Sequence, residues 1–416
     1  RLILDSIRRH DLENSLLYVR NPRQIKGLAA QFRLSWTAVM KNIILGIVGS
    51  CLVANAAWAE GDDPSIWHLS GFGTAGVSHS NNSDADFVSN VTEAHGAGET
   101  NATSAAVDSK LGVQISATPN DNVVAVLQIL TQQRWDGSWT PTVEWANVSY
   151  QLTPDLNVRL GRTVWPMFVR SQTVNVGYSN FAVRASGELA AEMPNTHNDG
   201  VDATYNFKTG AAQNALTLFG GKSKIHYGDY LPNTIFDVKK IVGVSDMVEL
   251  YGWTLHAAAM HMQYTYTAPG VAPSPVKLPI YSVGAVYDSD GWYTQGDYQL
   301  ALDPYYGRMK SLAVLGGYHF GAISPYVSYS SFDQSTFGPG VPAPLQSPIQ
   351  HDRILGVRYD IKTGVDVKLQ LDNIKTGDVA GSFPISLVFP NNGDRYPQFL
   401  AHPSANVISV VVDFVF

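Results

Sequence analysis

The sequence predicts an all-β fold: a transmembrane antiparallel β-barrel of about sixteen strands, with short periplasmic turns and long external loops. Apolar and polar residues alternate along many segments, and short and long connections follow one another in turn. Beyond residue 60 no apolar run approaches the ~20 residues of a membrane helix. Only 15 % of residues are charged, below the roughly 25 % usual in soluble domains. The 36 Gly and 20 Tyr favour strands and turns.

The region before residue 60 has the features of a targeting segment. Met40 to Asn42 form a short positive n-region, Ile43 to Ala54 an apolar h-region, and Ala57 to Ala59 a small-x-small cleavage site. A retained membrane anchor and a lipoprotein acylated at Cys51 are the alternatives, although the residues before Cys51 make a poor lipobox. We therefore predict a non-native upstream extension over 1–39, a signal peptide over 40–59 and a barrel over 60–416.

Loss of residues 1–59 changes the charge of the chain. That segment holds eight of the 28 Lys/Arg and three of the 35 Asp/Glu, which leaves 20 basic and 32 acidic residues and a net charge of −12. Nucleic acid is therefore not an expected partner, because phosphate contacts need a basic face. This negative net charge predicts a weak preference of the barrel for cations. Cys51 is the only cysteine, so the mature chain has no disulfide, thiol chemistry or cysteine metal site.

Period-two patterning is clearest over residues 365–372, where every odd position is apolar and every even one polar. In a membrane barrel the apolar face meets lipid and the polar face lines water. The same alternation covers 355–361 and 323–329, and the last strand carries it to the C-terminus. Strand parity therefore predicts four pore-lining residues, and a one-residue slip in register would reverse each of them. They are Arg358, Asp366, Lys368 and Asp413.

The connections alternate in length. Short turns are predicted at 118–122, 153–155, 208–212, 249–252, 288–291, 320–322 and 360–364. Long segments separate them, at 80–107, 134–141, 163–198, 223–236, 267–278, 303–310, 333–350 and 376–404. A soluble sandwich has no reason to alternate its loop lengths in this way, whereas an even-stranded membrane barrel does.

Three blocks carry a resemblance to a known family. The first strand, Leu69–Gly76, is rich in small residues, and Asn157–Arg162 is followed by Pro166, Val176–Tyr178 and Arg184. Ile408, Val410, Val412, Phe414 and Phe416 share one face of a closing strand that ends on an aromatic residue. In these features the chain resembles the Gram-negative outer-membrane porin superfamily.

The resemblance implies a sixteen-stranded porin of the cell outer membrane, usually a homotrimer, with its third loop folded inward to narrow the pore. The expected function is a passive channel for ions and small hydrophilic solutes, and the expected partners are outer-membrane lipid, lipopolysaccharide and those solutes. The Pro-Glu-Phe-Gly-Gly tip found in the third loop of many general porins is absent, so the shape of the constriction is left open.

The candidate constriction lies around the loop at 163–198, which is long for a connection without a role. Arg159 should face the lumen because Val158 and Leu160 take the opposite side of the strand. Opposed charges across a narrow pore bias the choice of ion, although solvated loop charges or local ion pairs are the alternative. The predicted constriction residues are Arg159, Arg162, Arg170, Arg184, Glu188 and Glu192.

No pattern indicates an enzyme, a cofactor or a metal site. Gly71–Gly76 matches G-x-G-x-x-G, but a polar loop follows it where a dinucleotide site needs a helix. His256 and His261 are five apart and should point to opposite faces of a strand. His79 and Ser80 are adjacent, so they cannot form a nucleophile and base pair.

Three alternative functions stay open. A substrate-selective channel could use Tyr178, Phe181 and Tyr293 as an aromatic slide. A closed barrel could act as an adhesin or surface-binding scaffold through its external loops. A barrel-embedded lipid hydrolase would need a catalytic Ser/His pair that the sequence does not offer.

Overall fold

Sixteen long antiparallel strands close into a ring in the computed structural model, which describes residues 66–190, 196–228, 233–268, 271–304, 307–335, 349–376, 386–388 and 404–416. The ring strands are β1 Trp67–Ser80, β4 Lys110–Asn120, β5 Val123–Gln132, β6 Thr142–Thr153, β7 Leu156–Val164, β8 His197–Thr209, β9 Ala212–His226, β10 Ile235–Leu250, β11 Trp253–Ala268, β12 Val271–Ser289, β13 Trp292–Asp303, β14 Gly307–Tyr318, β15 Ile323–Ser335, β16 Ile349–Lys362, β17 Val365–Thr376 and β19 Ser404–Val415. Three further strands, β2 Asp86–Phe87, β3 Thr103–Ser104 and β18 Leu387–Val388, have two residues each. The predicted upstream extension and signal peptide, 1–59, lie outside the described residues.

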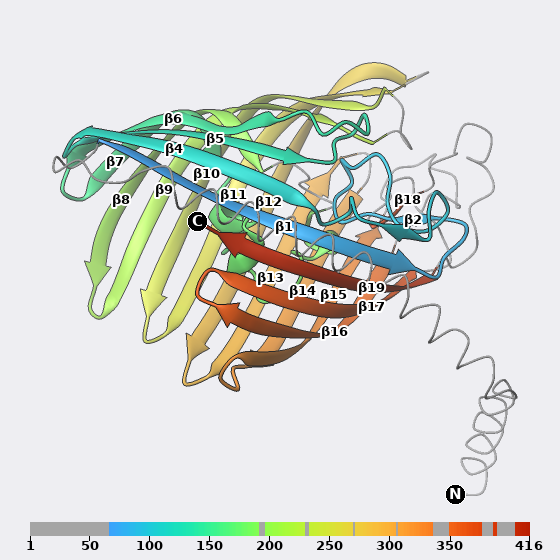
Figure 1. Ribbon diagram of the computed structural model, residues 1–416. Helices are drawn as coiled ribbons and strands as arrows, with labels where there is room; N and C mark the ends of the chain where they lie inside the picture. Colours follow the sequence, from blue (N-terminus) through green and yellow to red (C-terminus); the bar gives the residue numbers. More distant parts are fainter. Residues whose placement is uncertain are drawn as a thin grey trace, which may run out of the picture. The chain divides into compact units, whose positions relative to one another are not determined.

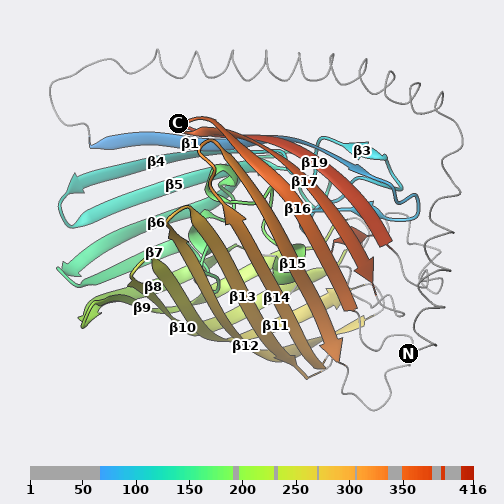
Figure 2. The same ribbon diagram turned by 90° about the horizontal axis from the view of Figure 1, so that it is seen from below.

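The first and last strands form the seam that closes the ring. β1 pairs with β4 on one side and with β19 on the other, so in Figure 1 the blue first strand lies beside the red last one. Gly71 and Phe416 exchange backbone hydrogen bonds of 2.9 and 3.0 Å across this seam. Figure 2 shows the same ring from below. Closure removes the two free edges that an open sheet would expose.

The ring is apolar outside and polar inside. On β17, Lys368 and Gln370 are fully buried, whereas Leu369 and Leu371 are each 42 % exposed. A soluble sandwich would bury the leucines and expose the polar residues. The outward apolar face and inward polar face are those of a membrane barrel, as the sequence pattern predicts.

Aromatic side chains cover glycines on neighbouring strands at several places around the ring. An ideal Cβ on any of these glycines would lie within about 2.3 Å of an aromatic ring atom, so only glycine leaves room for the ring above it. The directly paired partners are Gly73 with Phe414, Gly112 with Phe72, Gly243 with Phe219 and Gly356 with Tyr326. The glycines of β1 therefore make room for the aromatic side chains of the C-terminal strand.

The predicted connections are correct at one end of the ring and partly wrong at the other. The seven short turns lie where the sequence predicts them, and Gly252, Gly291 and Gly364 turn with a φ of +80° to +82°, which glycine adopts readily. The long loops predicted at 267–278 and 303–310 are wrong. β12 begins at Val271 and β14 at Gly307, so two and three residues make these links.

The prolines of β12 explain the first of these errors. Pro273 and Pro275 lie within 267–278 and suggest a loop there, because proline cannot donate to a sheet ladder. The pairing of β12 with β13 begins only at Ile280, so the stretch before it pairs with β11 alone. An edge of this kind tolerates proline, because the missing N–H can fall on the unpaired side.

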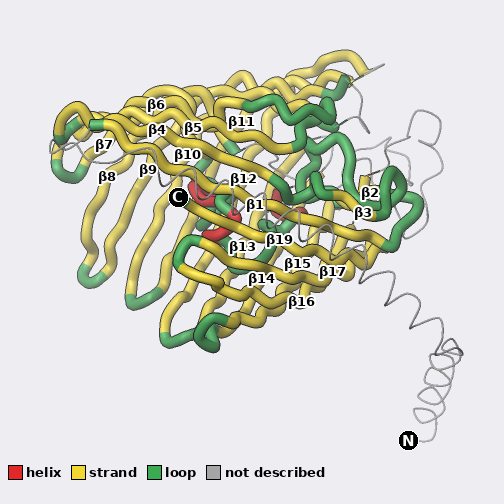
Figure 3. Tube along the Cα trace, viewed as in Figure 1, coloured by secondary structure: helices red, strands yellow, loops and turns green. Residues whose placement is uncertain are grey.

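In the residues that the structure describes, helical structure is limited to short turns in the connection between β7 and β8. These are η1 Ser171–Thr173, η2 Gly177–Ser179 and α3 Gly187–Ala190. Figure 3 shows them in red within the ring of strands. No helix in the described part of the chain is long and apolar enough to cross a membrane.

Candidate functional site in the lumen

Residues 165–190, called the inner loop below, enter the lumen after β7 and contact two different parts of its wall. The first part is apolar. Trp165 and Met167 are buried in one cluster with Ile241, Met260 and Ile280 of β10–β12. The hydroxyl of Ser282 donates to the carbonyl of Met167. Inward positions of this wall are apolar where the inner loop covers them, so burial of apolar surface holds this end of the loop.

The second part of the wall is charged and lies on β16, β17 and β19. Lys368 Nζ donates to the carbonyl of Gly177 at 2.7 Å and to Asp413 at 2.9 Å, and it lies 3.7 Å from Asp366. Lys368, Asp366 and Asp413 are all fully buried. These three predicted pore-lining residues do face inward, but they hold the inner loop to the wall.

Arg358, the fourth predicted pore-lining residue, binds the same segment. Its Nη1 donates to the carbonyls of Tyr178 and Asn180 at 2.9 and 3.2 Å. Its Nη2 lies 3.1 Å from Asp366 and 2.8 Å from Asp360. The guanidinium therefore joins η2 to the wall as well as balancing two carboxylates.

Arg184 is the most heavily bonded side chain of the inner loop. It donates to Asp108 at 2.7 and 2.8 Å and to Asp372 at 3.2 Å, and it also reaches Ser409. Burial lowers the pKa of Arg184, but the charges of Asp108 and Asp372 outweigh it and raise that pKa. Burial raises the pKa of Asp108, whereas Arg184 brings it below its usual value. Both groups are therefore ionised and paired.

The remaining predicted constriction residues have separate surroundings. Glu188 is buried and accepts from Ser330 and Gln350 at 2.7 Å each. Arg159 pairs with Asp202 at 2.8 Å and Arg162 with Asp199 at 2.7 Å, both across β7 and β8. Glu192 lies outside the described residues. The structure thus places local ion pairs at Arg159, Arg162 and Arg184, and a role of these residues in a constriction stays a prediction.

Arg170 differs from these arginines because no carboxylate pairs with it in the described ranges. Its Nη2 donates to the hydroxyl of Tyr293 at 3.1 Å. Phe181 stacks on the same Tyr293 with ring centroids 4.4 Å apart, and Tyr178 stacks against Arg358. The three aromatic residues considered for a slide therefore pack where the inner loop meets the wall.

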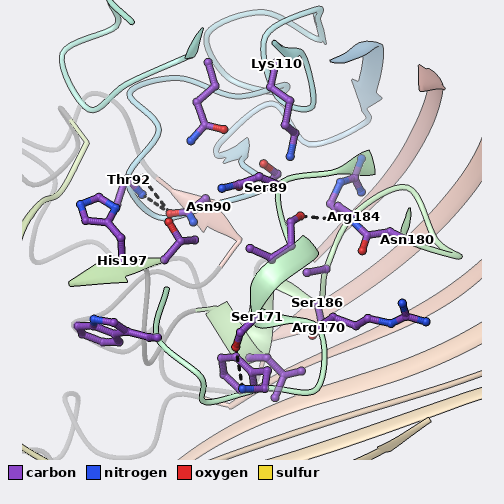
Figure 4. A pocket seen from close by; sticks show the side chains of 18 of the residues that line it. Ser89, Asn90, Thr92, Lys110, Arg170, Ser171, Asn180, Arg184, Ser186 and His197 are labelled. Atoms are coloured by element: carbon purple, nitrogen blue, oxygen red, sulfur yellow. Dashed lines mark hydrogen bonds between the residues drawn. The ribbon is translucent and has the colours of Figure 1, made fainter. Parts of the chain in front are cut away.

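Within the described residues, a cavity of about 460 Å³ lies beside the inner loop. It lies between the inner loop, the loop 81–109 and the walls, and Figure 4 shows Lys110, Arg170, Arg184 and His197 around it. Its lining includes six cationic residues, Lys110, Arg134, Arg162, Arg170, Arg184 and Lys224, and three acidic ones, Glu93, Glu144 and Asp297. A pocket of this size can hold a small solute.

Four lining residues of the cavity were not among the predicted site residues: Lys110, Arg134, Glu93 and Trp165. Strand parity could have found Lys110, because Leu111 and Val113 are outward-facing and exposed, which turns Lys110 inward. Arg134 and Glu93 lie in loops, where no periodic pattern gives the direction of a side chain.

Glu93 gives a prediction for pH dependence. The pKa of Glu93 rises from 4.5 to about 8, chiefly because burial disfavours the charged form; the nearby Asp108 also raises this pKa, whereas hydrogen bonds from Ser89 and the charge of Lys110 lower it in part. The folded protein then holds a proton that the unfolded chain releases above pH 4.5, so this group's contribution to stability falls from about pH 4.5 to pH 8. We expect Glu93→Gln to reduce the fall in the thermal unfolding midpoint between pH 5 and pH 8. An identical pH dependence in both proteins would contradict this.

The sequence motifs set aside above have ordinary places in the fold. Gly71–Gly76 lies within β1, and the next element along the chain is the short strand β2, not a helix. His256 is buried with its Nε2 3.1 Å from the carbonyl of Pro166. His79 contacts Thr103, whereas Ser80 is buried. Among the residues that the structure describes, no group of three or more ligating side chains could hold a metal ion.

Comparison with known proteins finds relatives by structure alone. No family model matches the sequence, and no curated protein matches it. The outer membrane channel DcaP of Acinetobacter baumannii is similar, with a TM-score of 0.56 and 13 % identity over 86 % of this chain and 100 % of that one. The anion-selective porin from Comamonas acidovorans has a TM-score of 0.53 and 14 % identity over 84 % and 99 %. OmpT of Vibrio cholerae has a TM-score of 0.53 and 11 % identity over 86 % of this chain and 100 % of its own.

At these identities the likeness establishes the fold. That fold is a closed antiparallel β-barrel like those of the outer-membrane channel and porins that it matches. The chain has the sixteen-stranded porin-like fold that the resemblance in its sequence implies.

Proposed function

We propose that the protein is an outer-membrane porin, a passive channel for ions and small hydrophilic solutes. The observation that carries this proposal is the inverted barrel, apolar outside and polar inside, with an unfilled cavity beside the inner loop. Solutes move down their gradients through the cavity, the inner loop limits their size, and facing charges bias their passage. Nothing in this mechanism requires a cofactor or a catalytic group.

The same proposal places the protein in the outer membrane with lipid and lipopolysaccharide around its apolar belt. Leu160, Leu218 and Val327 belong to this belt, each more than half exposed in the single chain. We also propose a homotrimer, as in the trimer form of the similar OmpT of Vibrio cholerae. These assignments rest on the fold and on the signal peptide predicted over 40–59.

The test is single-channel conductance. The full chain is expressed in a Gram-negative host, purified from the outer-membrane fraction and added to a planar bilayer. Discrete current steps are expected. An absence of current steps from folded, inserted protein would contradict the proposed channel function. It would favour a closed barrel that works through its external loops, for which the dense bonding of the inner loop is the supporting observation.

A further inference from the structure

The cavity beside the inner loop has the opposite charge to the chain as a whole. The chain carries a net charge of −7, yet the cavity lining has six Lys/Arg against three Asp/Glu. An ion in a narrow pore responds to charges within about a Debye length, ~8 Å at physiological salt, and acids on distant loops and turns are screened. The local balance therefore decides which ion passes.

Several of these cations are not neutralised by neighbours. Arg162 and Arg184 pair with carboxylates. Within the described part of the chain, Lys110, Arg134 and Arg170 have no carboxylate within ion-pair distance, and Figure 4 shows Lys110 and Arg170 at the cavity. An unpaired cation in a partly desolvated cavity acts on a passing ion more strongly than one in open water.

The three acidic groups of the cavity do not cancel the charge of its six cations. Glu93 has a pKa of about 8 and is therefore mostly protonated at pH 7. Glu144 accepts hydrogen bonds from Thr196 and Asn175 and lies 3.4 Å from His197. Asp297 accepts from Gln295 at 2.8 Å, and neither Asp297 nor Glu93 has a cationic partner at ion-pair distance in the described ranges.

From these observations we infer that the cavity is an anion-selective passage in which Lys110, Arg134 and Arg170 attract small anions, a result that reverses the cation preference expected from net charge. The inference rests on the proposed channel function. Anions gain from the unpaired cations, and cations are repelled by them. No covalent step is involved.

The first experiment is the reversal potential of single channels in a KCl gradient. Wild-type protein is expected to pass chloride in preference to potassium. Lys110→Gln combined with Arg134→Gln should move the permeability ratio towards potassium. Lys208→Gln is the matched control, because Lys208 is an exposed residue of β8 near a short turn and outside the cavity lining. A potassium preference in wild type, or a ratio unmoved in the double variant, would overturn the inference.

A second experiment does not require conduction. Trp135 and Trp165 line the cavity, so iodide drawn to its cations should quench tryptophan fluorescence. The iodide quenching slope of the folded protein in detergent should fall in the double variant, whereas the slope for neutral acrylamide should not change. An iodide slope equal to wild type would overturn the anion site even in a barrel that carries no current. Absent current steps with a reduced iodide slope would instead contradict only the channel.

Discussion

Arg184→Gln is expected to lower the free energy of unfolding by about 3–5 kcal/mol, the usual effect of breaking a buried ion pair on one side. The substitution leaves Asp108 and Asp372 buried without their shared cation. It also frees the distal part of the inner loop from the wall, so single-channel conductance should rise. Urea unfolding in detergent and planar-bilayer recordings measure the two effects.

Arg353→Gln is the matched control for this variant. Arg353 is exposed on β16, so its loss removes the same charge without opening a buried pair and should change stability by less than ~0.5 kcal/mol. Equal unfolding curves for Arg184→Gln and wild type would show that the inner loop is held without this residue.

Gly177→Ala is expected to displace η2 from the wall although it adds only one methyl group. A Cβ at Gly177 would lie 1.9 Å from Asp413 Oδ1 and 2.5 Å from Thr74 Oγ1, much closer than side-chain atoms approach. Overpacking of this kind costs about 1–3 kcal/mol. The variant should also weaken the hydrogen bond from Lys368 to the Gly177 carbonyl and make the open-channel current noisier.

Gly316→Ala provides the comparison for the glycine variant. A Cβ on Gly316, in β14, meets no heavy atom within 4 Å, so stability and current should stay at wild-type values. If Gly177→Ala behaves in the same way, the inner loop has room to move and the close approach at η2 does not fix its position.

The barrel was predictable because its pattern is local. The alternation over 365–372 needs only the neighbours of each residue, and it correctly predicts that Asp366 and Lys368 turn inward while Leu369 turns outward. The prolines of β12 led to a wrong prediction, because a loop was expected where the strand begins. They mark a loop in most sheets, but here they lie on a stretch that has a partner on one side only.

The site was less predictable because its contacts are distant in sequence. Parity places Lys368 inside but cannot show that its Nζ meets Gly177, 191 residues earlier. Arg184 and Asp372 are likewise 188 residues apart. Lys368 and Arg358, which were expected to line an open pore, are hydrogen-bonded to the inner loop instead. Lys110 and Arg134, which were not among the predicted site residues, line the cavity.

The seam between β1 and β19 sets the order in which the barrel can be assembled. Thr74 and Asp413 bond across it although 339 residues separate them, and the aromatic residues that cover the glycines of β1 are synthesised long after those glycines. Until β19 has been made, every incomplete ring has two exposed strand edges that can pair with other chains. Contacts this distant in sequence also form slowly. We therefore expect the pairing of β1 with β19 to form late in folding.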